Sequence, residues 1–552
     1  MTLPRPSILA ILLFLLAMVV LIPGISEITG VTGKDEYLLG LRTPMHMLEG
    51  HHGWLPWLDG EPRLKKPPLI YWLGKLSYET FGVSLFAGRI IGVIFAALLT
   101  VTSALIAWCL LSDRRYMLLS GLVVLGSIGV MIDGRRLMLD IPVAALSALA
   151  ILFLLRWRRS GYFGYAPAAG ISLGLAFLVK GPVGLFFFGA ALVALLLASP
   201  GSAAFLKRKW LAALTGMLSF AAVGIPWFVY IYLHYPDLLA ETFSTEVAER
   251  ELFNVSLSPL FSLLLMALPW SPVAIAVMLR RDPATTVSPG WINIRRFLAV
   301  WMIVSLLPFF FFKSFSRYLY GCMVPLSLLA GLLVFAGASW EKYRPWLRTG
   351  GVLAIITASL LVFILLWFRG WQPVVIAPIL FILAFALCWL QPTELYRMAA
   401  LSILLWLGAV SMVYPAIGIN RLPQGVLAMV KGEYVVLFAG PQPAMLPIAS
   451  GMGMRDTSRL ASLPAAKRDQ CGGFLLFSPT RHFITAEHQL RELGHRWTEL
   501  GRFRVLSSRG SWINIANEDA TRDDWVRAFQ SHDLDSLATE LILVRSTAEK
   551  CL

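Results

Sequence analysis

Acidic side chains stand at the edges of two apolar segments of this chain. Asp35 and Glu36 in "GKDEYLLG" follow one apolar run, and Asp140 in "DGRRLMLDIPV" opens another. A charge at such a boundary is costly unless it is paired or used, and a carboxylate beside a substrate can accept the proton of an attacking hydroxyl group. Asp35, Glu36 and Asp140 are therefore the candidate catalytic residues, with activation of a nucleophile as their chemistry.

Basic side chains stand at similar boundaries and suit a complementary task, the binding of a phosphate. They occur in "RLKKPP", "FLVKGPVGL", "STEVAERELF" and "KSFSRYLY". One such residue often only contacts lipid headgroups, but several cations together can stabilise an anionic leaving group. The candidate phosphate-binding residues are Lys66, Lys180, Arg250, Lys313 and Arg317, and we expect Lys65, Tyr71 and Tyr318 to line the substrate cavity.

Membrane-spanning helices must position these residues. Hydrophobic residues make up 57% of the 552-residue chain and charged residues 14%, and the mean hydropathy is +0.71. Runs of roughly 17 to 25 apolar residues, each able to cross the bilayer as a helix, recur up to residue 416. The sequence thus predicts a polytopic α-helical membrane protein with about 13 spans, which begin near residues 7, 86, 116, 139, 164, 182, 211, 257, 297, 321, 349, 373 and 398.

The distribution of Lys and Arg predicts the orientation of these spans. The short loops "LSDRRY", "RWRRSG" and "LKRKW" are basic, which is typical of the cytoplasmic side. The long loop of residues 30–85 and the chain beyond 417 then lie outside, together with every candidate site residue. Aromatic and ionisable residues alternate in that loop, so we expect short helices at the membrane surface. The net charge of +15 is largely a signal of topology and does not indicate nucleic acid.

From about residue 428 the composition changes to that of a soluble domain. Short β-rich runs such as "EYVVLFAG" and "CGGFLLFSP" alternate with helical runs such as "AEHQLRELG". We predict a transmembrane catalytic domain of residues 1–420 and a small soluble α/β domain of residues 421–552. Cys471 and Cys551 both fall in the second domain, and whether they pair is open. The chain has no Walker loop and no G-x-G-x-x-G motif after a strand.

The order of several motifs resembles a known family of membrane enzymes. The pair "DE" follows the first span, and then come "KPPLIYW", the Asp that opens the fourth span, "LVKGPVGL", "PWFVYIY" and "SRYLYGCMVPLSLLAG". This order resembles the GT-C glycosyltransferases of the protein-mannosyltransferase-like group. Within that group the chain is most similar to the ArnT-like lipid A 4-amino-4-deoxy-L-arabinose transferases. The resemblance covers roughly the whole membrane part.

The resemblance implies an inverting transfer of a sugar, aminoarabinose or a similar one. The donor would be an undecaprenyl phosphate sugar, and the acceptor lipid A or another cell-envelope molecule, at the periplasmic face of a bacterial inner membrane. It gives the role of general base to Asp35, the second acidic position to Asp140, and contact with the donor phosphate to Lys66 and Arg250.

The chain departs from the family at two motifs. It reads "DEYLLGL" where relatives have "DEGRYAE", so an Arg and a Tyr are missing. It reads "KKPP" where they have "EKPP", so Lys65 replaces an acidic group that can bind a metal in a relative. The metal is therefore unknown, and a divalent cation is the one cofactor that the sequence leaves open.

Alternative functions stay open at this point. A transferase could use the same donor to modify a protein or another glycan. A lipid or solute transporter would place its charges near the centres of its spans, whereas here they gather at one face. A non-enzymatic scaffold would leave the paired carboxylates without a use. The expected partners are a polyprenyl phosphate sugar, an envelope acceptor and membrane lipids, and no nucleic acid.

Overall fold

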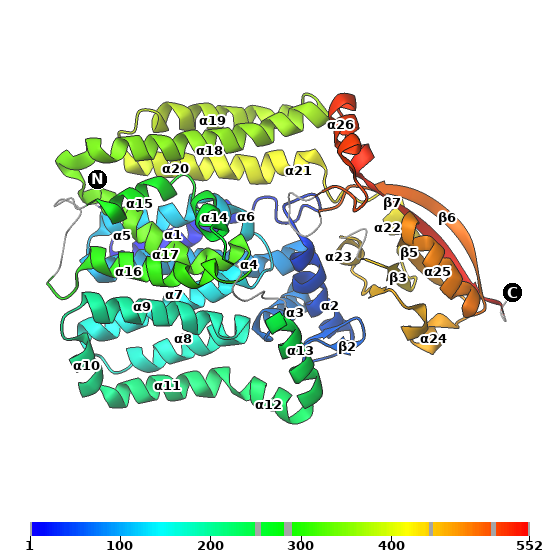
Figure 1. The fold of residues 1–552 in the computed structure, drawn as a ribbon, viewed down its shortest axis with the longest axis horizontal. Helices are drawn as coiled ribbons and strands as arrows, with labels where there is room; N and C mark the ends of the chain where they lie inside the picture. The colour runs from blue at the N-terminus through cyan, green and yellow to red at the C-terminus, as the bar shows by residue number, and fades with distance from the viewer. Residues whose placement is uncertain (1–2, 249–254, 281–289, 441–444, 509–514, 550–552) are drawn as a thin grey trace.

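The structure is a computed structural model that describes residues 3–248, 255–280, 290–440, 445–508 and 515–549. In these parts of the chain, long helices lie side by side in one bundle and a five-stranded sheet lies at one end of it (Figure 1). A helix satisfies its own backbone hydrogen bonds, which is why apolar segments in a bilayer adopt this form. The bundle extends to Ile417, and the sheet begins at Val435.

Apolar helices occur where the sequence predicts spans. The helix expected from residue 349 already begins at Trp340, and the other predicted starts lie within a few residues of a helix start. These helices are α1 (Pro6–Leu21), α4 (Leu85–Leu111), α5 (Arg114–Leu125), α7 (Asp140–Ser160), α8 (Tyr165–Lys180), α9 (Val183–Ala198), α11 (Trp210–Gly224), α14 (Ser258–Met266), α16 (Ile294–Leu306), α17 (Tyr320–Gly331), α18 (Trp340–Arg369), α19 (Ile376–Trp389) and α20 (Leu395–Gly408).

These helices differ in whether they are long and apolar enough to cross a membrane. Among the described residues, five helical segments are long and apolar enough to cross a membrane by themselves, or up to eight if each bent pair is one span. The bent pairs are α9 with α10 (Ser202–Arg208), α11 with α12 (Pro226–His234), and α14 with α15 (Ser271–Leu279), and their bends are 113°, 44° and 114°. Proline is the first residue of α12, just after the end of α11, and the second residue of α15.

The first loop (residues 22–84) folds into short elements at one end of the bundle. They are the π-helix η1 (Glu36–Leu41), α2 (Arg42–Glu49), the hairpin strands β1 (Trp57–Leu58) and β2 (Glu61–Pro62), and α3 (Leu69–Phe81). Asp59 and Gly60 both have positive φ in the turn of the hairpin, a conformation that the Asp-Gly pair favours. α13 (Pro236–Ala248) lies at the same end, whereas α6 (Ile128–Asp133) lies within the bundle beside α14 (Figure 1).

The C-terminal part of the chain forms a small domain that contains a mixed sheet with the strand order β4-β3-β5-β7-β6. β3 is parallel to β4 and β5, whereas β7 is antiparallel to β5 and β6. The strands are β3 (Val435–Phe438), β4 (Arg455–Thr457), β5 (Phe474–Pro479), β6 (His495–Val505) and β7 (Thr539–Ala548). The helices are α22 (Val426–Val430), α23 (Leu446–Ser450), α24 (Ala465–Arg468), α25 (Thr480–Glu492) and α26 (Arg522–Ser531). This agrees with the expected small α/β domain.

Both faces of the central strands are covered. Val436 and Leu476 pack with α25 on one face, and Leu437 and Phe477 pack with α22 and α23 on the other. Such double burial explains why "YVVLF" and "FLLF" are continuous apolar runs without alternation. Cys471 is disulfide-bonded, and Cys551 lies outside the described residues.

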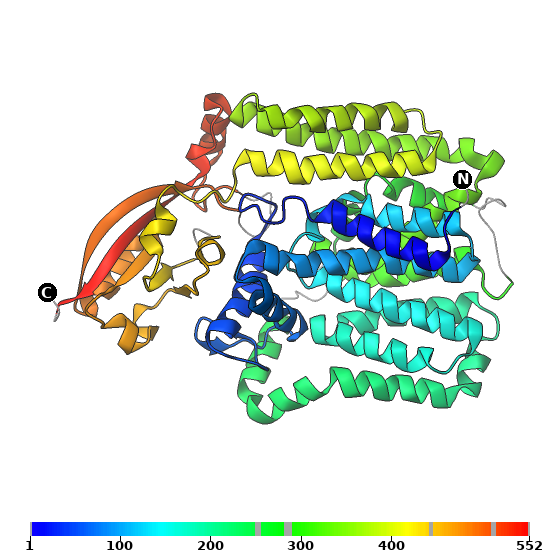
Figure 2. The same ribbon diagram turned by 180° about the vertical axis from the view of Figure 1, so that it is seen from behind.

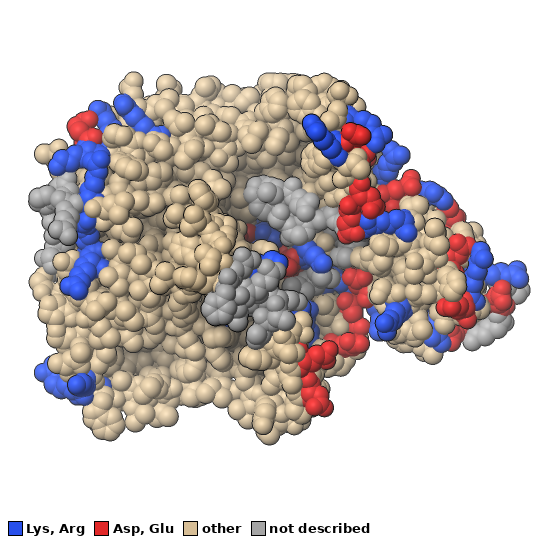
Figure 3. All heavy atoms as spheres, in the orientation of Figure 1, with Lys and Arg blue, Asp and Glu red and all other residues tan. Residues whose placement is uncertain are grey.

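The two ends of the bundle differ in charge. The first loop and the C-terminal domain lie at one end, and the N-terminus lies at the other (Figures 1 and 2). Figure 3 shows Lys and Arg side chains gathered along the N-terminal end. The basic loops that the sequence analysis assigns to the cytoplasm therefore share one end, and the candidate site residues of the first loop share the opposite end.

Candidate active site

A cavity of about 360 Å³ opens between the first loop and the bundle. Its wall comes from η1, the loop before α3, the start of α7, the end of α8 and the segment before α17. Nine of the predicted site residues line it: Asp35, Lys65, Lys66, Tyr71, Asp140, Lys180, Lys313, Arg317 and Tyr318. Segments that are far apart in the sequence thus supply one polar chamber. Arg250, the other predicted phosphate-binding residue, lies outside the described residues.

One guanidinium joins the two carboxylates of the cavity. Arg317 Nη2 donates a hydrogen bond to Asp35 Oδ2, and its Nε lies 3.5 Å from Asp140 Oδ2. The side chain of Asp35 is 33% exposed and that of Asp140 only 5%. Asp35 is therefore the more accessible of the two carboxylates, and Asp140 is nearly buried.

Lys180 is held on two sides. Its Nζ donates to Asp140 Oδ1 and lies 3.8 Å from the centre of the Tyr318 ring, a cation–π contact. Gly181, directly after it, has φ +59° and ψ −137°, a conformation that residues with a Cβ rarely adopt. The turn ends α8 there, which makes Lys180 the last residue of the helix and places it at the cavity.

Close backbone packing fixes the position of Asp35. Asp35 precedes η1, and Gly40 in that helix lies so close to the chain of Leu137 that an added Cβ would meet the Leu137 carbonyl oxygen at 2.1 Å. A larger residue at position 40 would push η1 away from the segment that leads to Asp140. Glycine at this position is therefore required for the approach of the two carboxylates.

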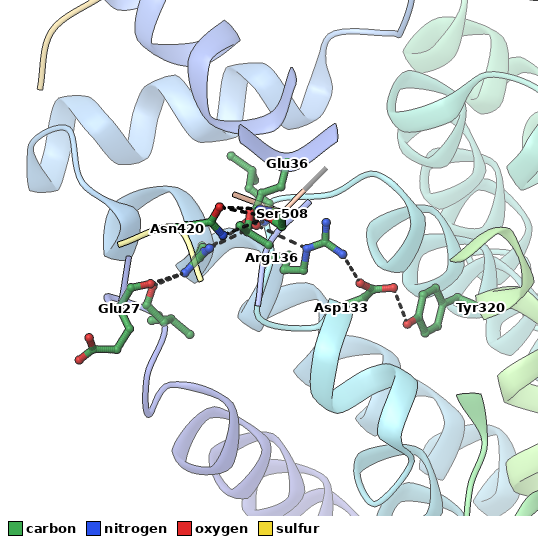
Figure 4. A network of polar contacts seen from close by, with 11 residues as sticks. Glu27, Glu36, Asp133, Arg136, Tyr320, Asn420 and Ser508 are labelled. Atoms are coloured by element: carbon green, nitrogen blue, oxygen red, sulfur yellow. Dashed lines mark hydrogen bonds and ion pairs between the residues drawn. The ribbon is translucent and has the colours of Figure 1, made fainter. Parts of the chain in front are cut away.

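Glu36 is not part of the cavity wall. It is fully buried, and Arg89 Nε and Nη2 donate to its two carboxylate oxygens at 2.8 and 3.2 Å. Thr32 Oγ1 donates to it at 2.6 Å and Arg136 Nε at 3.4 Å (Figure 4). Glu36, which the sequence analysis predicts as catalytic, is thus not among the residues that line the cavity, and its burial and its arginine partners indicate a structural anchor beside Asp35.

The network of polar contacts around Glu36 continues into the bundle. Arg136 Nη1 donates to Asp133 Oδ1 at 2.6 Å, and the Tyr320 hydroxyl donates to Asp133 Oδ2 at 2.8 Å (Figure 4). Burial opposes ionisation of Glu36, but Arg89 and Arg136 together hold its pKa below the usual value. Glu36 is therefore an ionised carboxylate whose charge is balanced by two arginines.

Replacing Glu36 tests this structural role. Glu36→Gln leaves two buried guanidinium groups without their counter-charge, so we expect a loss of about 3–5 kcal/mol in stability. The measurement is thermal unfolding of the purified protein. Because the folded-state pKa is depressed, the difference from wild type is full above the usual glutamate pKa of 4.5 and shrinks as pH falls through the lowered pKa.

The control for that variant is Glu341→Gln. Glu341 pairs with Arg344 at 2.9 Å but its side chain is 68% exposed, and an exposed pair contributes only about 0–1 kcal/mol. Equal unfolding temperatures for the Glu36 and Glu341 variants would contradict the structural role of Glu36.

Arg63 and Phe315 line the cavity but are absent from the predicted site. Arg63 Nε and Nη2 are buried and have no hydrogen-bond partner among the described residues, so this guanidinium can still bind an anion. Its only sequence signal is its position three residues before Lys66, in a loop where many cations are present. Phe315 is 51% exposed and lies under Arg317, 4.5 Å from ring centre to guanidinium carbon.

A metal site is not evident in the parts of the chain that the structure describes. Among those residues, no three His, Cys, Asp or Glu side chains are grouped in a way that could hold a metal ion. The divalent cation that the sequence leaves open has no candidate ligand set there.

Comparisons with known proteins show what this chain is similar to in sequence. Residues 65–230 match the family described as dolichyl-phosphate-mannose-protein mannosyltransferase. The chain is 29% identical over 241 residues to an uncharacterized protein of Aquifex aeolicus, covering 41% of this chain and 47% of that protein. It is 30% identical over 311 residues to the undecaprenyl phosphate-alpha-4-amino-4-deoxy-L-arabinose arabinosyl transferase of Pseudomonas aeruginosa, covering 52% of each. The chain spans about half the length of the curated relatives it matches.

The fold comparison covers nearly the whole chain. The crystal structure of ArnT from Cupriavidus metallidurans bound to undecaprenyl phosphate matches with a TM-score of 0.72 and 15% identity, over 97% of both chains. The apo form of the same protein matches with a TM-score of 0.70 and 16% identity, also over 97% of both.

This chain is therefore a multi-pass membrane protein with the GT-C fold. Its fold is similar to that of ArnT over nearly the whole chain, and its sequence is similar to the arabinosyl transferases over about half of their length. The predicted GT-C helical fold with a small C-terminal sheet domain is thereby confirmed.

Proposed function

We propose that this protein is an inverting glycosyltransferase that moves a sugar from undecaprenyl phosphate to lipid A or another cell-envelope acceptor. The observation that carries the proposal is the cavity, where Asp35 and Asp140 meet Lys66, Lys180 and Arg317. The names of the curated relatives support the donor and the sugar, aminoarabinose or a similar one. Modification of a protein or another glycan with the same donor is the alternative.

The first chemical task is to stabilise the leaving phosphate. A polyprenyl phosphate sugar carries its leaving group with it, so negative charge grows on the phosphate as the bond to the sugar breaks. Preorganised cations in a chamber with little water stabilise that charge strongly. We assign this task to Lys66, Lys180, Arg317 and Lys313, with the buried guanidinium of Arg63 as an addition that the sequence analysis lacks.

The second task is to activate the acceptor. Asp35 is the accessible carboxylate, and in this proposal it takes the proton of an acceptor hydroxyl while the oxygen attacks the anomeric carbon from the face opposite the phosphate. A single displacement of this kind inverts the anomeric centre. If the acceptor is itself a phosphate, the attacking oxygen is already ionised and Asp35 mainly positions it.

The orientation and the domain roles are part of the same proposal. Basic side chains gather at the N-terminal end of the bundle, which supports a cytoplasmic location for that end. The cavity and residues 421–552 would then face the periplasm, and residues 1–420 would form the catalytic domain in the inner membrane. A lipid-borne donor would enter the cavity laterally from the bilayer.

The test is transfer by the purified protein. It is incubated with short-chain polyprenyl phosphate sugars and with Kdo-lipid A, and the product is followed by mass spectrometry and its anomeric configuration by NMR. Glycosylated lipid A with an inverted anomeric centre is the expected product. Transfer only to a peptide or another glycan would support the alternative acceptor, and retention of configuration would contradict the single displacement.

Lys66 offers a separate test of the phosphate site. Lys66→Ala removes a cation from the cavity wall, so we expect the dissociation constant of the donor to rise about tenfold or more. Acceptor affinity should change far less, and both are measured by equilibrium binding of labelled lipids. Lys75→Ala is the control, because Lys75 belongs to the same loop but pairs with Glu79 at 3.1 Å outside the cavity. Equal weakening of donor and acceptor would count against the assignment.

A further inference from the structure

Two of the segments that line the cavity are arms of the first loop. The carboxylate arm (residues 34–49) contains Asp35, η1 and α2, and the lysine arm (residues 57–66) contains the β1–β2 hairpin and Lys66. Their relative position decides how far the proposed base lies from the proposed phosphate site. Both arms reach the C-terminal domain through contacts outside the cavity wall.

A single buried arginine joins the two arms to each other and to that domain. Arg42 is fully buried, and its Nη2 donates at 2.6 Å both to Asp59 Oδ1 in the hairpin and to the carbonyl oxygen of Met454. Its Nε and Nη1 have no hydrogen-bond partner in the described parts of the chain. The charge of this guanidinium is therefore balanced through one nitrogen, and loss of that contact would leave a buried cation unpaired.

Further contacts to the same C-terminal segment surround this joint. The backbone N–H of Asp456 donates to Asp59 Oδ1 at 2.9 Å, and that of Gly453 donates to Glu49 Oε1 at 2.5 Å. At Gly60, an added Cβ would lie 3.0 Å from Arg455 Nη1, so the hairpin turn touches this segment directly. We call residues 453–456 the clamp segment, because they hold both arms at once.

The chain between the joint and the cavity is short on each side. Arg42 and Asp35 are connected by η1, whose residues continue into α2 in helical conformation, so the separation along the helix is on the order of 10 Å. On the other arm, Asp59 is followed by β2, which ends at Pro62, directly before Arg63 at the cavity wall. A shift at the clamp segment is therefore carried to the cavity residues of both arms.

We propose that the clamp segment of the C-terminal domain sets the distance between the carboxylate arm and the lysine arm, and that Arg42 is a positioning residue for Asp35. The consequence for catalysis rests on the proposed glycosyltransferase function, whereas the clamp itself does not. In this proposal the C-terminal domain positions residues of the site, although none of its described residues lines the cavity.

The charges at the joint give the clamp a pH dependence. Burial raises the pKa of Asp456 to about 6, with a smaller contribution from Asp59 and opposition from Arg42. His46 is neutral at pH 7, because burial lowers its pKa to about 4. The charged and titratable groups around Asp456 are Lys34 and Tyr37 of the carboxylate arm, Arg42 and His46 of α2, Asp59 of the lysine arm and Arg455 of the same strand.

The sign of this dependence follows from the raised pKa. Stabilisation from protonated Asp456 is full below the usual aspartate pKa of 3.8 and is lost as pH rises through about 6. Asp456→Asn keeps a neutral group of the same shape at all pH values. We therefore expect the unfolding temperature of the wild type to fall relative to Asp456→Asn between about pH 4 and pH 6. Equal pH dependence of the two proteins would contradict a role for this carboxylate.

The main test replaces Arg42 in the full-length protein. Arg42→Met removes the charge and keeps an unbranched apolar side chain, and Arg42→Lys keeps a positively charged hydrogen-bond donor. Hydrogen–deuterium exchange at one pH is expected to become faster in residues 34–49 and 57–66 of Arg42→Met, because local opening follows lost contacts. The kcat for sugar transfer is expected to fall about 10²-fold while the KM for the donor changes little, since misplacement affects the reacting geometry. Arg42→Lys should restore part of both.

Arg545→Met is the matched control. Arg545 pairs with Glu433 at 2.7 Å inside the C-terminal domain, so its loss perturbs that domain without touching the clamp segment. Unchanged exchange in both arms of Arg42→Met, or the same change in Arg545→Met, overturns the inference. Absence of transfer by the wild type overturns the proposed function alone, because the exchange measurement tests the clamp without any substrate.

Discussion

Asp35→Asn is expected to lower kcat for sugar transfer by about 10²–10⁴-fold, the range that a general base contributes. The asparagine amide has nearly the same shape as the carboxylate, and its oxygen can still accept the hydrogen bond from Arg317, so the fold and the donor site are expected to stay intact. The loss should therefore appear in kcat, with donor binding unchanged. Single-turnover transfer followed by mass spectrometry measures it.

The outcome also separates two acceptor chemistries. With a hydroxyl acceptor the full loss is expected, whereas a phosphate acceptor is already ionised and needs less help, so a smaller loss would indicate that chemistry. Glu79→Gln is the control, because Glu79 lies in the same loop, is 43% exposed and stands outside the cavity wall. A fully active Asp35→Asn with either acceptor would remove the proposed base.

Arg317→Gln is expected to lower kcat by about 10²–10³-fold, as is typical when a preorganised group at a developing charge is lost. Arg317 is the group that contacts both Asp35 and Asp140, so its loss also leaves two carboxylates facing each other without the cation between them. We therefore expect weaker donor binding as well, in contrast to Asp35→Asn. Paired measurements of kcat and of donor affinity distinguish the two variants.

The matched variant is Arg369→Gln. Arg369 ends α18, and its Nε donates to the carbonyl oxygen of Ile417 at 2.8 Å, outside the residues that line the cavity. It controls for the general cost of removing a partly buried arginine. An Arg317 variant that is as active as the Arg369 variant would show that the cavity does not bind the reacting phosphate.

The cavity also bears on the transporter alternative. The charges that the sequence places at the ends of spans meet in one chamber at one end of the bundle, in the parts of the chain that the structure describes. Transport through the membrane would require polar groups along a path between the two ends. The glycosyltransferase proposal requires charged groups only in the cavity at one end of the bundle, which is where these side chains lie.

The sequence alone predicted the apolar helices, the buried strands and most of the charged residues that line the cavity. Hydropathy located the apolar helices that match the predicted spans, such as α1, α4 and α7, because each apolar run must be buried in lipid or protein. Charge at the ends of apolar runs identified Asp35, Asp140, Lys180 and Arg317, since such residues persist there only when they are paired or used. The continuous apolar runs after residue 428 indicated buried strands for the same reason.

Only the tertiary structure decided which neighbouring residues face the cavity and which serve as supports. Asp35 and Glu36 are adjacent carboxylates with the same sequence signal, but one faces the cavity and the other lies among Arg89 and Arg136. Arg63 and Arg42 are likewise two arginines of one loop, of which one lines the chamber and the other joins the loop to the C-terminal domain. The reason is physical. Burial and ion pairing depend on partners that are distant in the chain, and the local sequence does not show which residues those partners are.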